Sequence, residues 1–417
     1  MTDERRTTPT SAVAASPGKR AVRLALLRAV GAATAPLVPK ATRTPPARVL
    51  VIRPDHLGDA LFTTPALRAL REALPGAEII ALVGPWATAV YGRNPNLDRV
   101  LPCRFPGFAE QPQPHALAPY TLLRCTAAEV RHLDCDVALD LRYDFWWGAL
   151  LAQAARIPVR IGYAVPECAP FLSLALPYER GRHEVAQNLG LVAALAAGDG
   201  AGRQRWLAEV VTRARLEFPL TDGERQAATA FLAEVGGRGR PIVAIHPGTR
   251  GLAKLWTVAG WAGVADALSA RLGATVLLTG STAEDTLCTQ IAAQMHKRAF
   301  VLAGRTTLGE LAALFARCTL VLGVDSGPLH FAAAAGVPTV HLYGPSDHVA
   351  FAPFGDPARH AVVRAGLACS PCHKLDWPSQ VMPEHDCMRA IAPADVLAAA
   401  ERVLAGVNAS DRDERAW

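Results

Sequence analysis

The chain is poor in aromatic and charged residues. Only 6% of its 417 residues are Phe, Trp or Tyr and 19% are charged, whereas 51% are hydrophobic. Ala, Leu, Val and Gly therefore provide most of the apolar surface, which is typical of buried strands alternating with packed helices. The length indicates two domains or slightly more.

No uncharged apolar run reaches 18 residues, so we expect that no segment spans a membrane. The apolar stretch 21–39 is broken by Arg23 and Arg28 and is too polar for the core of a secretory signal. Nine scattered cysteines, an odd number, argue against a disulfide scaffold and favour a reducing compartment. The sequence thus predicts a cytoplasmic protein.

The body of the chain has no excess of positive charge, although the formal net charge is +6. Residues 1–48 hold nine Lys or Arg against Asp3 and Glu4, a balance of +7, which leaves −1 for everything after. Since no basic patch interleaved with aromatics occurs elsewhere, nucleic acid is excluded as an expected partner.

Residues 1–46 form a basic extension rich in Pro and Ala. We expect a helix near 19–33, in which Arg20, Arg23 and Arg28 stand beside apolar residues. Such a helix can lie on an anionic membrane surface. The alternative is a solvated or loosely packed extension.

The next stretch predicts a βαβ unit. The strands are expected at 48–52 and 78–83, the loop between strand and helix at 53–59, and the helix at 60–73. In such a unit the turn places Gly58 and Asp59 at the helix N-terminus, above the carboxyl edge of the sheet. Alternatively, Asp59 only complements the helix dipole.

The same pattern continues and restarts in the second half. Further strands are expected at 97–101, 137–141, 241–245, 275–279 and 320–324. One helix is expected to contain residues 261–268, another to contain residues 311–315, and a third to lie at 392–404. Another helix is expected around His183, Glu184 and Asn188. Strands that alternate with helices predict an α/β protein of two Rossmann-like, doubly wound domains that face each other across a cleft.

The 320–324 strand ends in a sharp turn of small residues that precedes an Ala-rich helix. Ser326, Gly327 and the first N–H groups of that helix then point outward at the carboxyl end of the sheet, where an anion can bind. Asp325 and His330 flank the turn. An ordinary turn with Asp325 as the helix N-cap is the alternative.

Two patterns concern metal ions. Asp134-Cys135-Asp136 has a spacing with which many sugar transferases hold a divalent cation, but it precedes the 137–141 strand and so lies at the wrong end of the sheet. A second pattern suits either a zinc site or a structural, occasionally oxidised loop. It consists of Cys369, Cys372, His373, His385 and Cys387.

Three segments together resemble a known family. They are the 53–59 loop with Thr63-Thr64-Pro65-Ala66-Leu67, the His246-Pro247-Gly248 loop with Lys254-Leu255-Trp256, and Gly323-Val324-Asp325-Ser326-Gly327-Pro328-Leu329-His330. Their order and approximate spacing are similar to those of glycosyltransferase family 9, the heptosyltransferases that build the inner core of bacterial lipopolysaccharide. The resemblance covers roughly residues 47–405.

The resemblance implies the GT-B architecture, with an acceptor-binding domain at 47–225, a nucleotide-sugar-binding domain at 226–405 and a tail at 406–417. It implies an inverting enzyme that uses a nucleotide-activated sugar, typically ADP-L-glycero-D-manno-heptose, and that needs no metal or other cofactor. The implied partners are this donor and a lipopolysaccharide or glycolipid acceptor. Peripheral contact with the cytoplasmic face of the inner membrane is an expectation from the basic extension.

The resemblance also implies residue roles. Asp59 would be the general base that takes the proton of the acceptor hydroxyl, with Arg53, His56 and Gly58 on the acceptor-side loop. Lys254, the second catalytic residue, would neutralise the donor diphosphate. Ser326, Gly327 and His330 would hold the phosphates, and Asp325 and Glu284 would place the nucleoside. Thr249 would be a further donor-binding residue.

These roles suit the chemistry. Departure of a nucleoside diphosphate builds negative charge, which fixed donors such as a helix N-terminus, a lysine and a histidine can offset without a metal. The acceptor hydroxyl is a weak nucleophile, so a carboxylate on the opposite face of the sugar completes an in-line inversion.

The chain departs from the family pattern at two motifs, and its N-terminal extension is longer than the family core requires. Thr249 is followed by Arg250-Gly251-Leu252-Ala253 where a Thr or Ser pair is typical, which makes Arg250 a candidate for a second cation. Asp376 and Trp377 stand where another cysteine is expected in the Cys-rich loop. Two other functions stay open: a nucleotide-sugar epimerase of similar architecture, which would turn over UDP-sugars without acceptor, and a nucleotide-binding relative without catalysis.

Overall fold

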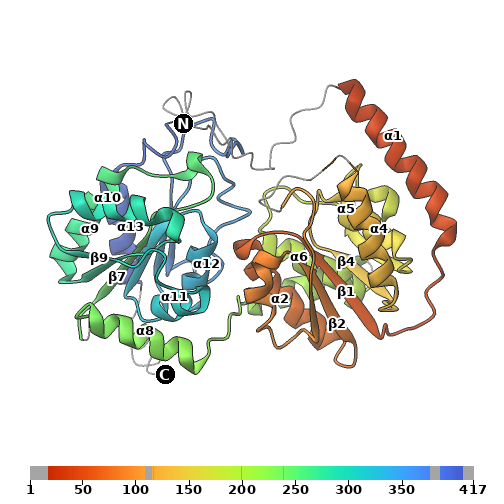
Figure 1. The fold of residues 1–417 in the computed structure, drawn as a ribbon, viewed down its shortest axis with the longest axis horizontal. Helices are drawn as coiled ribbons and strands as arrows, with labels where there is room; N and C mark the ends of the chain where they lie inside the picture. The colour runs from red at the N-terminus through yellow and green to blue at the C-terminus, as the bar shows by residue number, and fades with distance from the viewer. Residues whose placement is uncertain are drawn as a thin grey trace. The chain divides into compact units, whose positions relative to one another are not determined.

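The computed structural model describes residues 17–108, 115, 117–198, 200–237, 239–375 and 386–406. The chain divides into two compact units, unit 1 (Met1–Ala214) and unit 2 (Arg215–Trp417). Each unit contains a six-stranded parallel sheet with helices on both faces (Figure 1). The predicted α/β class with two doubly wound domains is therefore confirmed. No helix among the described residues is long and apolar enough to cross a membrane.

Unit 1 has the strand order β3-β2-β1-β4-β5-β6. Its strands are β1 (Arg48–Arg53), β2 (Glu78–Val83), β3 (Arg99–Pro102), β4 (Val137–Asp140), β5 (Val159–Tyr163) and β6 (Leu174–Leu176). Its helices are α1 (Pro17–Thr34), α2 (Leu57–Ala73), α3 (Thr88–Tyr91), α4 (Ala118–Arg131), α5 (Trp146–Ala154), α6 (Glu184–Ala196) and α7 (Gly200–Arg213), with short 3-10 helices η1 (Ala35–Leu37), η2 (Pro85–Ala87) and η3 (Ala169–Phe171).

The central strand β1 is buried along nearly its whole length, because a parallel sheet covered on both faces needs apolar side chains toward each. Leu50 and Ile52 pack with α4 and α5 on one face. On the other side α2 packs against α6. Ile52 pairs with Asp140 of β4, so the loops after β1 and β4 emerge next to each other at the carboxyl edge.

Helix α2 begins at Leu57, earlier than expected, and therefore contains Asp59 in its first turn. It also contains Pro65, which has no N–H to donate to the carbonyl group of Leu61. The hydroxyl of Thr64 donates to that carbonyl at 2.8 Å instead. The Thr-Pro sequence is thus accommodated without an orphaned acceptor.

Unit 2 has the strand order β12-β11-β10-β7-β8-β9. Its strands are β7 (Ile242–His246), β8 (Thr275–Leu278), β9 (Ala299–Val301), β10 (Leu320–Val324), β11 (Thr339–Leu342) and β12 (His360–Val363). Its helices are α8 (Asp222–Glu234), α9 (Val258–Leu272), α10 (Asp285–Gln294), α11 (Leu308–Phe315), α12 (Gly327–Ala334) and α13 (Pro393–Ala405), with η4 (Leu252–Lys254) and η5 (Thr282–Glu284).

Alternate residues of the unit 2 strands face two apolar clusters, as the pleat of a strand requires. Val243 and Leu322 pack with α9, α10 and α13, whereas Ala244 and Val321 pack with α8, α11 and α12. In the middle of the sheet Gly323 of β10 pairs with His246 of β7. A Cβ atom at Gly323 would lie 2.5 Å from the His246 carbonyl oxygen, so this close approach requires glycine.

Candidate functional site

The first candidate site is a buried ion-pair cluster at the carboxyl edge of the unit 1 sheet. Its centre is Arg53, the last residue of β1, whose side chain is 2% exposed. Arg53 Nε lies 2.7 Å from Asp55 Oδ2. Its Nη2 atom lies 3.3 Å from Asp59 Oδ1 and 3.4 Å from Glu184 Oε2. One guanidinium group thus faces three carboxylates.

A second arginine, Arg142, contacts the same cluster from the loop after β4. It pairs with Asp55 and, through Nε at 2.5 Å, with Asp144. Burial favours the neutral form of Asp55, but the charges of Arg142 and Arg53 outweigh it and lower the pKa of Asp55. Asp55 is therefore a fixed negative charge inside the cluster.

Asp59 has a different environment although it shares the same arginine. Burial and the negative charge of Asp55 raise the pKa of Asp59 to about 7, against the opposing charge of Arg53. The Asp59 side chain is also 26% exposed, more than the side chains of Arg53, Asp55 and Glu184. A partly accessible carboxyl group with a pKa near neutrality can exchange a proton, as a general base must.

Hydrogen bonds to α6 and to the residue after β4 hold the cluster in place. Arg53 Nη1 donates to the carbonyl oxygen of Leu141 at 2.7 Å and to Asn188 Oδ1 at 3.2 Å. The Tyr178 hydroxyl donates to Glu184 Oε1 at 2.9 Å. Because Arg53 Nη1 donates to two buried acceptors, the orientation of the Arg53 side chain is constrained.

His56 and Gly58 lie at the start of α2. His56 is the N-cap residue, and its ring centroid lies 5.4 Å from that of Trp86 and 6.2 Å from that of Phe108. The indole N–H of Trp86 donates to the carbonyl oxygen of Asp55 at 2.8 Å. The loop therefore has an aromatic side with His56 and an ionic side with Arg53.

The second candidate site lies at the carboxyl edge of the unit 2 sheet. Lys254 Nζ lies 3.2 Å from Asp325 Oδ2, with side chains 14% and 11% exposed. The hydroxyl of Thr249 donates to the carbonyl oxygen of Asp325 at 3.4 Å. Burial opposes ionisation of Asp325, but the charges of Lys254 and His330 outweigh it and lower the pKa of this carboxyl group.

The N-terminus of α12 follows directly. Ser326 is its N-cap residue, and within the part of the chain that the structure describes its buried hydroxyl oxygen has no hydrogen-bond partner. Gly327 begins the helix, and His330 lies one turn further, 3% exposed. A buried hydroxyl group without a partner beside a helix N-terminus and a lysine fits an anionic ligand.

Glu284 lies against the His246-Pro247-Gly248 loop. Its Oε2 atom accepts hydrogen bonds from the Ser281 backbone N–H at 2.6 Å and from the Ser281 hydroxyl at 2.9 Å. A Cβ atom at Gly248 would overlap the Glu284 carboxyl group, so glycine at this position lets the carboxyl group lie against the backbone of the loop. The structure thus brings Glu284 and this loop together, while the exposed Arg250 lies further along it.

The structure places the expected residues in two groups: Arg53 and Asp59 in unit 1, and Thr249, Lys254, Asp325, Ser326, Gly327 and His330 in unit 2. Sequence analysis missed the roles of Asp55, Arg142, Glu184 and Asn188 in the first group. A signal existed for Arg142, because it directly follows the strand expected at 137–141. Nothing local indicated that Glu184 contacts Arg53, which is 131 positions away.

The Asp134-Cys135-Asp136 segment lies before β4, at the amino edge of the sheet. Asp136 Oδ2 accepts hydrogen bonds from the backbone N–H groups of Ala47 at 2.7 Å and Arg48 at 3.0 Å. Asp134 Oδ2 lies 3.1 Å from Arg43 Nη2. These carboxylates anchor the start of β1.

The cysteines are all unpaired thiols. Near the end of unit 2, Cys369 is exposed and Cys387 is buried, and burial together with the neighbouring Cys372 and Cys369 raises the pKa of Cys387. Among the residues that the structure describes, no group of three His, Cys, Asp or Glu side chains is placed to hold a metal ion. His385, Asp376 and Trp377 lie outside the described residues, so zinc binding at this loop stays a prediction.

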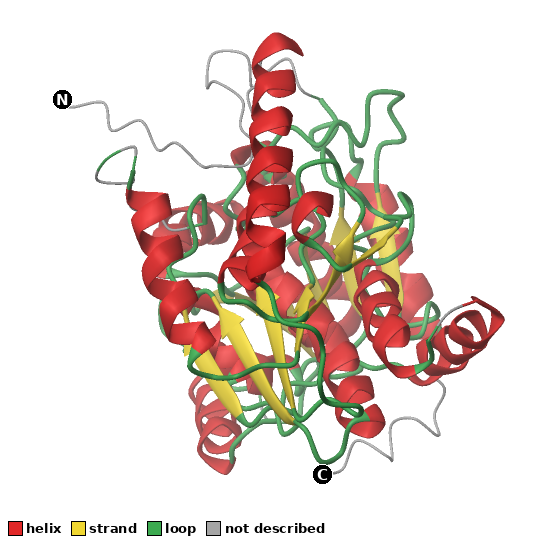
Figure 2. Cartoon of the chain, turned by 90° about the vertical axis from the view of Figure 1, so that its right-hand side faces the viewer, coloured by secondary structure: helices red, strands yellow, loops and turns green. Residues whose placement is uncertain are grey.

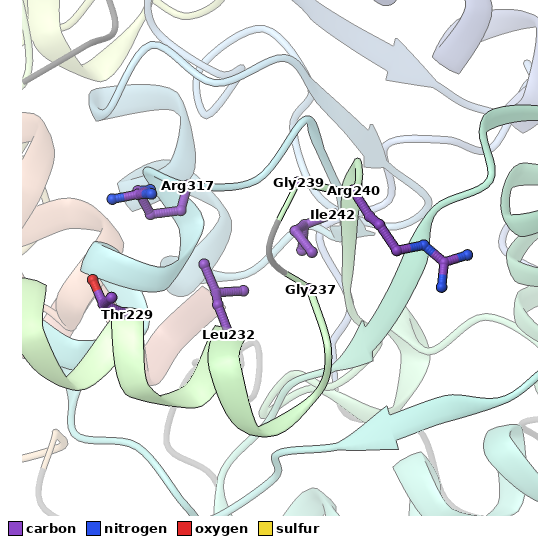
Figure 3. A pocket seen from close by; sticks show the side chains of 7 residues that line it. All are labelled: Thr229, Leu232, Gly237, Gly239, Arg240, Ile242 and Arg317. Atoms are coloured by element: carbon purple, nitrogen blue, oxygen red, sulfur yellow. The ribbon is translucent and has the colours of Figure 1, made fainter.

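A cavity of about 290 Å³ lies elsewhere in unit 2, at the amino end of β7 (Figure 3). Figure 3 shows that the side chains of Arg240 and Arg317 extend in opposite directions there. The guanidinium group of Arg240 donates to the carbonyl oxygen of Gly273 at 3.1 Å. The cavity is at the opposite edge of the sheet from Lys254 and Asp325 and does not belong to the candidate site.

Comparisons with known proteins show what the whole chain is similar to. Residues 125–380 match the family model of glycosyltransferase family 9 (heptosyltransferase). The chain is 27% identical over 307 residues to lipopolysaccharide heptosyltransferase 3 of Escherichia coli, covering 72% of this chain and 84% of that protein. It shares its fold with a solved family 9 glycosyl transferase from Veillonella parvula (24% identity, TM-score 0.69, 87% of this chain and 98% of that one). It also shares its fold with the ADP-heptose LPS heptosyltransferase II of E. coli (22% identity, TM-score 0.64, 86% and 98%).

Proposed function

This chain belongs to glycosyltransferase family 9, and from that premise we propose that it moves a heptosyl or related residue from an ADP-activated sugar to a lipopolysaccharide core or similar glycan acceptor. The names of its relatives support both substrates. The observation that carries the proposal is the position of Asp59, a partly exposed carboxyl group that lies 3.3 Å from the buried guanidinium group of Arg53. Burial and the charge of Asp55 raise the pKa of Asp59 to about 7, which suits a general base.

Asp59 acts in this proposal as the general base. Its carboxylate takes the proton of the acceptor hydroxyl while the oxygen attacks the anomeric carbon, which bonds to the acceptor as the bond to the diphosphate breaks. Arg53 holds Asp59 in position and stabilises its charged form. His56 and Gly58 shape the surface of the acceptor-side loop.

The unit 2 site holds the donor. Lys254 and the N-terminus of α12 offset the charge that builds on the departing diphosphate. Ser326, Gly327 and His330 contact the phosphate oxygens, and Thr249, Asp325 and Glu284 arrange the loops around the nucleoside. The Lys254 ion pair with Asp325 keeps the ammonium group at this position before the donor arrives.

We assign the reaction to a single displacement that inverts the anomeric carbon and requires no metal or other cofactor, because one base and one set of cationic donors suffice for it. Two measurements test this assignment. Transfer should persist in EDTA, and the product should carry the anomeric configuration opposite to that of the donor.

We place the enzyme in the cytoplasm, in peripheral contact with the inner membrane. Nine unpaired cysteines suit a reducing compartment, and a lipopolysaccharide acceptor is anchored in a bilayer. Cell fractionation tests this placement, since the protein should divide between the cytoplasmic and membrane fractions and leave the membrane in high salt.

The decisive experiment compares nucleotides before it measures transfer. ADP should raise the Tm of the purified protein more than UDP or GDP does, and ADP release from ADP-heptose should depend on a lipopolysaccharide core acceptor. Acceptor-independent conversion of UDP-sugars would identify an epimerase instead, and nucleotide binding without any turnover would indicate a relative that lacks catalysis.

A further inference from the structure

Helix α1 is a fixed part of unit 1. Leu27 is buried in a small apolar cluster with Leu150 of α5 and Phe171 of η3. Gln153 Nε2 donates to the carbonyl oxygen of Gly31 at 2.9 Å. This buried hydrogen bond and the packing of Leu27 fix which side of α1 faces the protein.

The opposite side of α1 is apolar and exposed. Val22, Leu26 and Val30 are 62%, 61% and 41% exposed, and their spacing of four residues places them along one stripe of the helix. Leu37 of η1, 56% exposed, lies close behind in the chain. These four are half of the eight large hydrophobic side chains that are exposed in the described parts of the chain. In Figure 2, α1 is the long helix nearest the viewer.

Positive charge flanks this apolar face. Arg23 and Arg28 are exposed, and neither forms an ion pair with any described residue. Arg20 lies 3.4 Å from Glu167, with its own side chain 62% exposed. Residues 17–47 contain no Asp or Glu. An apolar stripe bordered by cations suits an anionic lipid surface.

A groove of about 450 Å³ adjoins the helix between α1 and η3. Ala32, Ala35, Pro166 and Pro170 give it apolar walls, and Arg28 contributes to its lining. Hydrocarbon fits the walls, and a guanidinium group is a natural partner for a lipid phosphate.

We propose that the outer face of α1 rests in the interface of an anionic phospholipid bilayer, with Val22, Leu26 and Val30 inserted among the lipids and Arg23 and Arg28 on their phosphates. A symmetric contact with a second copy is disfavoured, since it would bring the same unpaired arginines together without any acid on the segment. This inference rests on the proposed function, because α1 would bring the enzyme to an acceptor that is anchored in the membrane.

Vesicle co-sedimentation of the full chain tests the inference without donor or acceptor, so it can fail independently of the proposed transferase activity. The protein should bind vesicles that contain phosphatidylglycerol, bind weakly to phosphatidylcholine alone, and leave the anionic vesicles in high salt. Val30→Glu should lower the partition coefficient about ten-fold, since it puts a charge into the apolar interface. Val349→Glu is the matched control, because Val349 is a similarly exposed valine (45%) in unit 2, and it should bind like the wild type.

Two further measurements complete the test. Arg23→Glu with Arg28→Glu should remove the preference for anionic over neutral vesicles. The Tm of each variant should equal that of the wild type, because the altered side chains are exposed. Equal binding by Val30→Glu and Val349→Glu would overturn the proposal. The proposal would also be overturned if the wild type did not bind vesicles and instead formed a dimer through α1. Light scattering would show such a dimer, and Val30→Glu would convert it to monomers.

Discussion

Asp59 in unit 1 and Asp325 in unit 2 occupy similar places in their sheets, yet their environments shift their pKa values in opposite directions. Both carboxylates lie just beyond the carboxyl end of a central parallel strand, and both contact a cationic side chain. The pKa of Asp59 is raised to about 7, whereas that of Asp325 is lowered.

The difference comes from the neighbours. Asp59 shares Arg53 with Asp55 and Glu184, so negative charge accumulates around it. Asp325 has Lys254 at 3.2 Å and is also affected by the positive charge of His330. The same residue type at the same kind of sheet edge thus has a raised pKa in one unit and a lowered pKa in the other.

The largest expected effect is the loss of the base. Asp59→Asn removes the proton acceptor but keeps the size of the side chain, so the transfer rate should fall about 10³-fold, within the range of general base catalysis. ADP release under saturating donor and acceptor measures it. ADP affinity should remain within about two-fold of the wild type, since unit 2 is unchanged.

Asp222→Asn is a suitable control, because Asp222 also lies in the first turn of a helix but is exposed on α8. It should leave the transfer rate unchanged. If Asp59→Asn impaired ADP binding as much as transfer, the assignment of Asp59 as base would be wrong.

Removal of the cation in unit 2 should have the next largest effect. Lys254→Ala should weaken ADP binding about 10- to 100-fold, the usual range for a charge-assisted hydrogen bond, because the diphosphate loses its partner and Asp325 repels it. Isothermal titration calorimetry measures the Kd. Lys297→Ala, an exposed lysine of the same unit, should bind ADP normally; equal weakening by both variants would exclude a specific role for Lys254.

At pH 8, removal of the charge should change the free energy of unfolding in opposite directions at Asp59 and Asp325. A carboxyl group whose folded pKa is raised destabilises the fold as pH rises from about 4 through 7, so Asp59→Asn should be more stable than the wild type by about 1–2 kcal/mol at pH 8. A carboxyl group whose folded pKa is lowered stabilises the fold at pH values above its unfolded pKa. This stabilisation is lost as the pH falls through the folded pKa. Asp325→Asn should therefore be less stable by about 2 kcal/mol at pH 8.

Thermal melts at pH 8 and at pH 4.5 provide the measurement. At pH 4.5 the gain of Asp59→Asn should nearly vanish, because the wild-type carboxyl group is then protonated in the folded state. If both variants shifted the Tm in the same direction at pH 8, the opposite pKa shifts assigned to Asp59 and Asp325 would be wrong.

The smallest expected effect concerns the pH profile. The rate should rise with pH as Asp59 loses its proton, with a midpoint near 7. Asp55→Asn removes the charge that helps to raise this pKa, so the midpoint should move down by about one pH unit. Asp98→Asn, which alters a carboxylate paired with Arg71 elsewhere in unit 1, should leave the midpoint in place; a profile shifted equally by both would argue against coupling of Asp55 to Asp59.

Much of the architecture could be predicted from the sequence. Buried strands in a parallel sheet are continuous apolar runs, and the turns after them carry glycine and small residues, so the strands ending at Arg53 and Val324 were placed nearly correctly. The start of α2 was placed too late, since Gly58 in the first turn weakens the local helical pattern. The sequence did not indicate the pairing of Lys254 with Asp325, because these residues are 71 positions apart.

The amino-acid sequence by itself determined the alternation of strands and helices, the motifs at the strand ends and the family, because these depend on residues close together in the chain. Only the tertiary structure decided that Arg53 is shared by three carboxylates, that Arg142 adds a second cation, and which side of α1 faces outward. Strand register and helix packing bring such groups together across as many as 131 positions, and burial at the meeting point sets their charge.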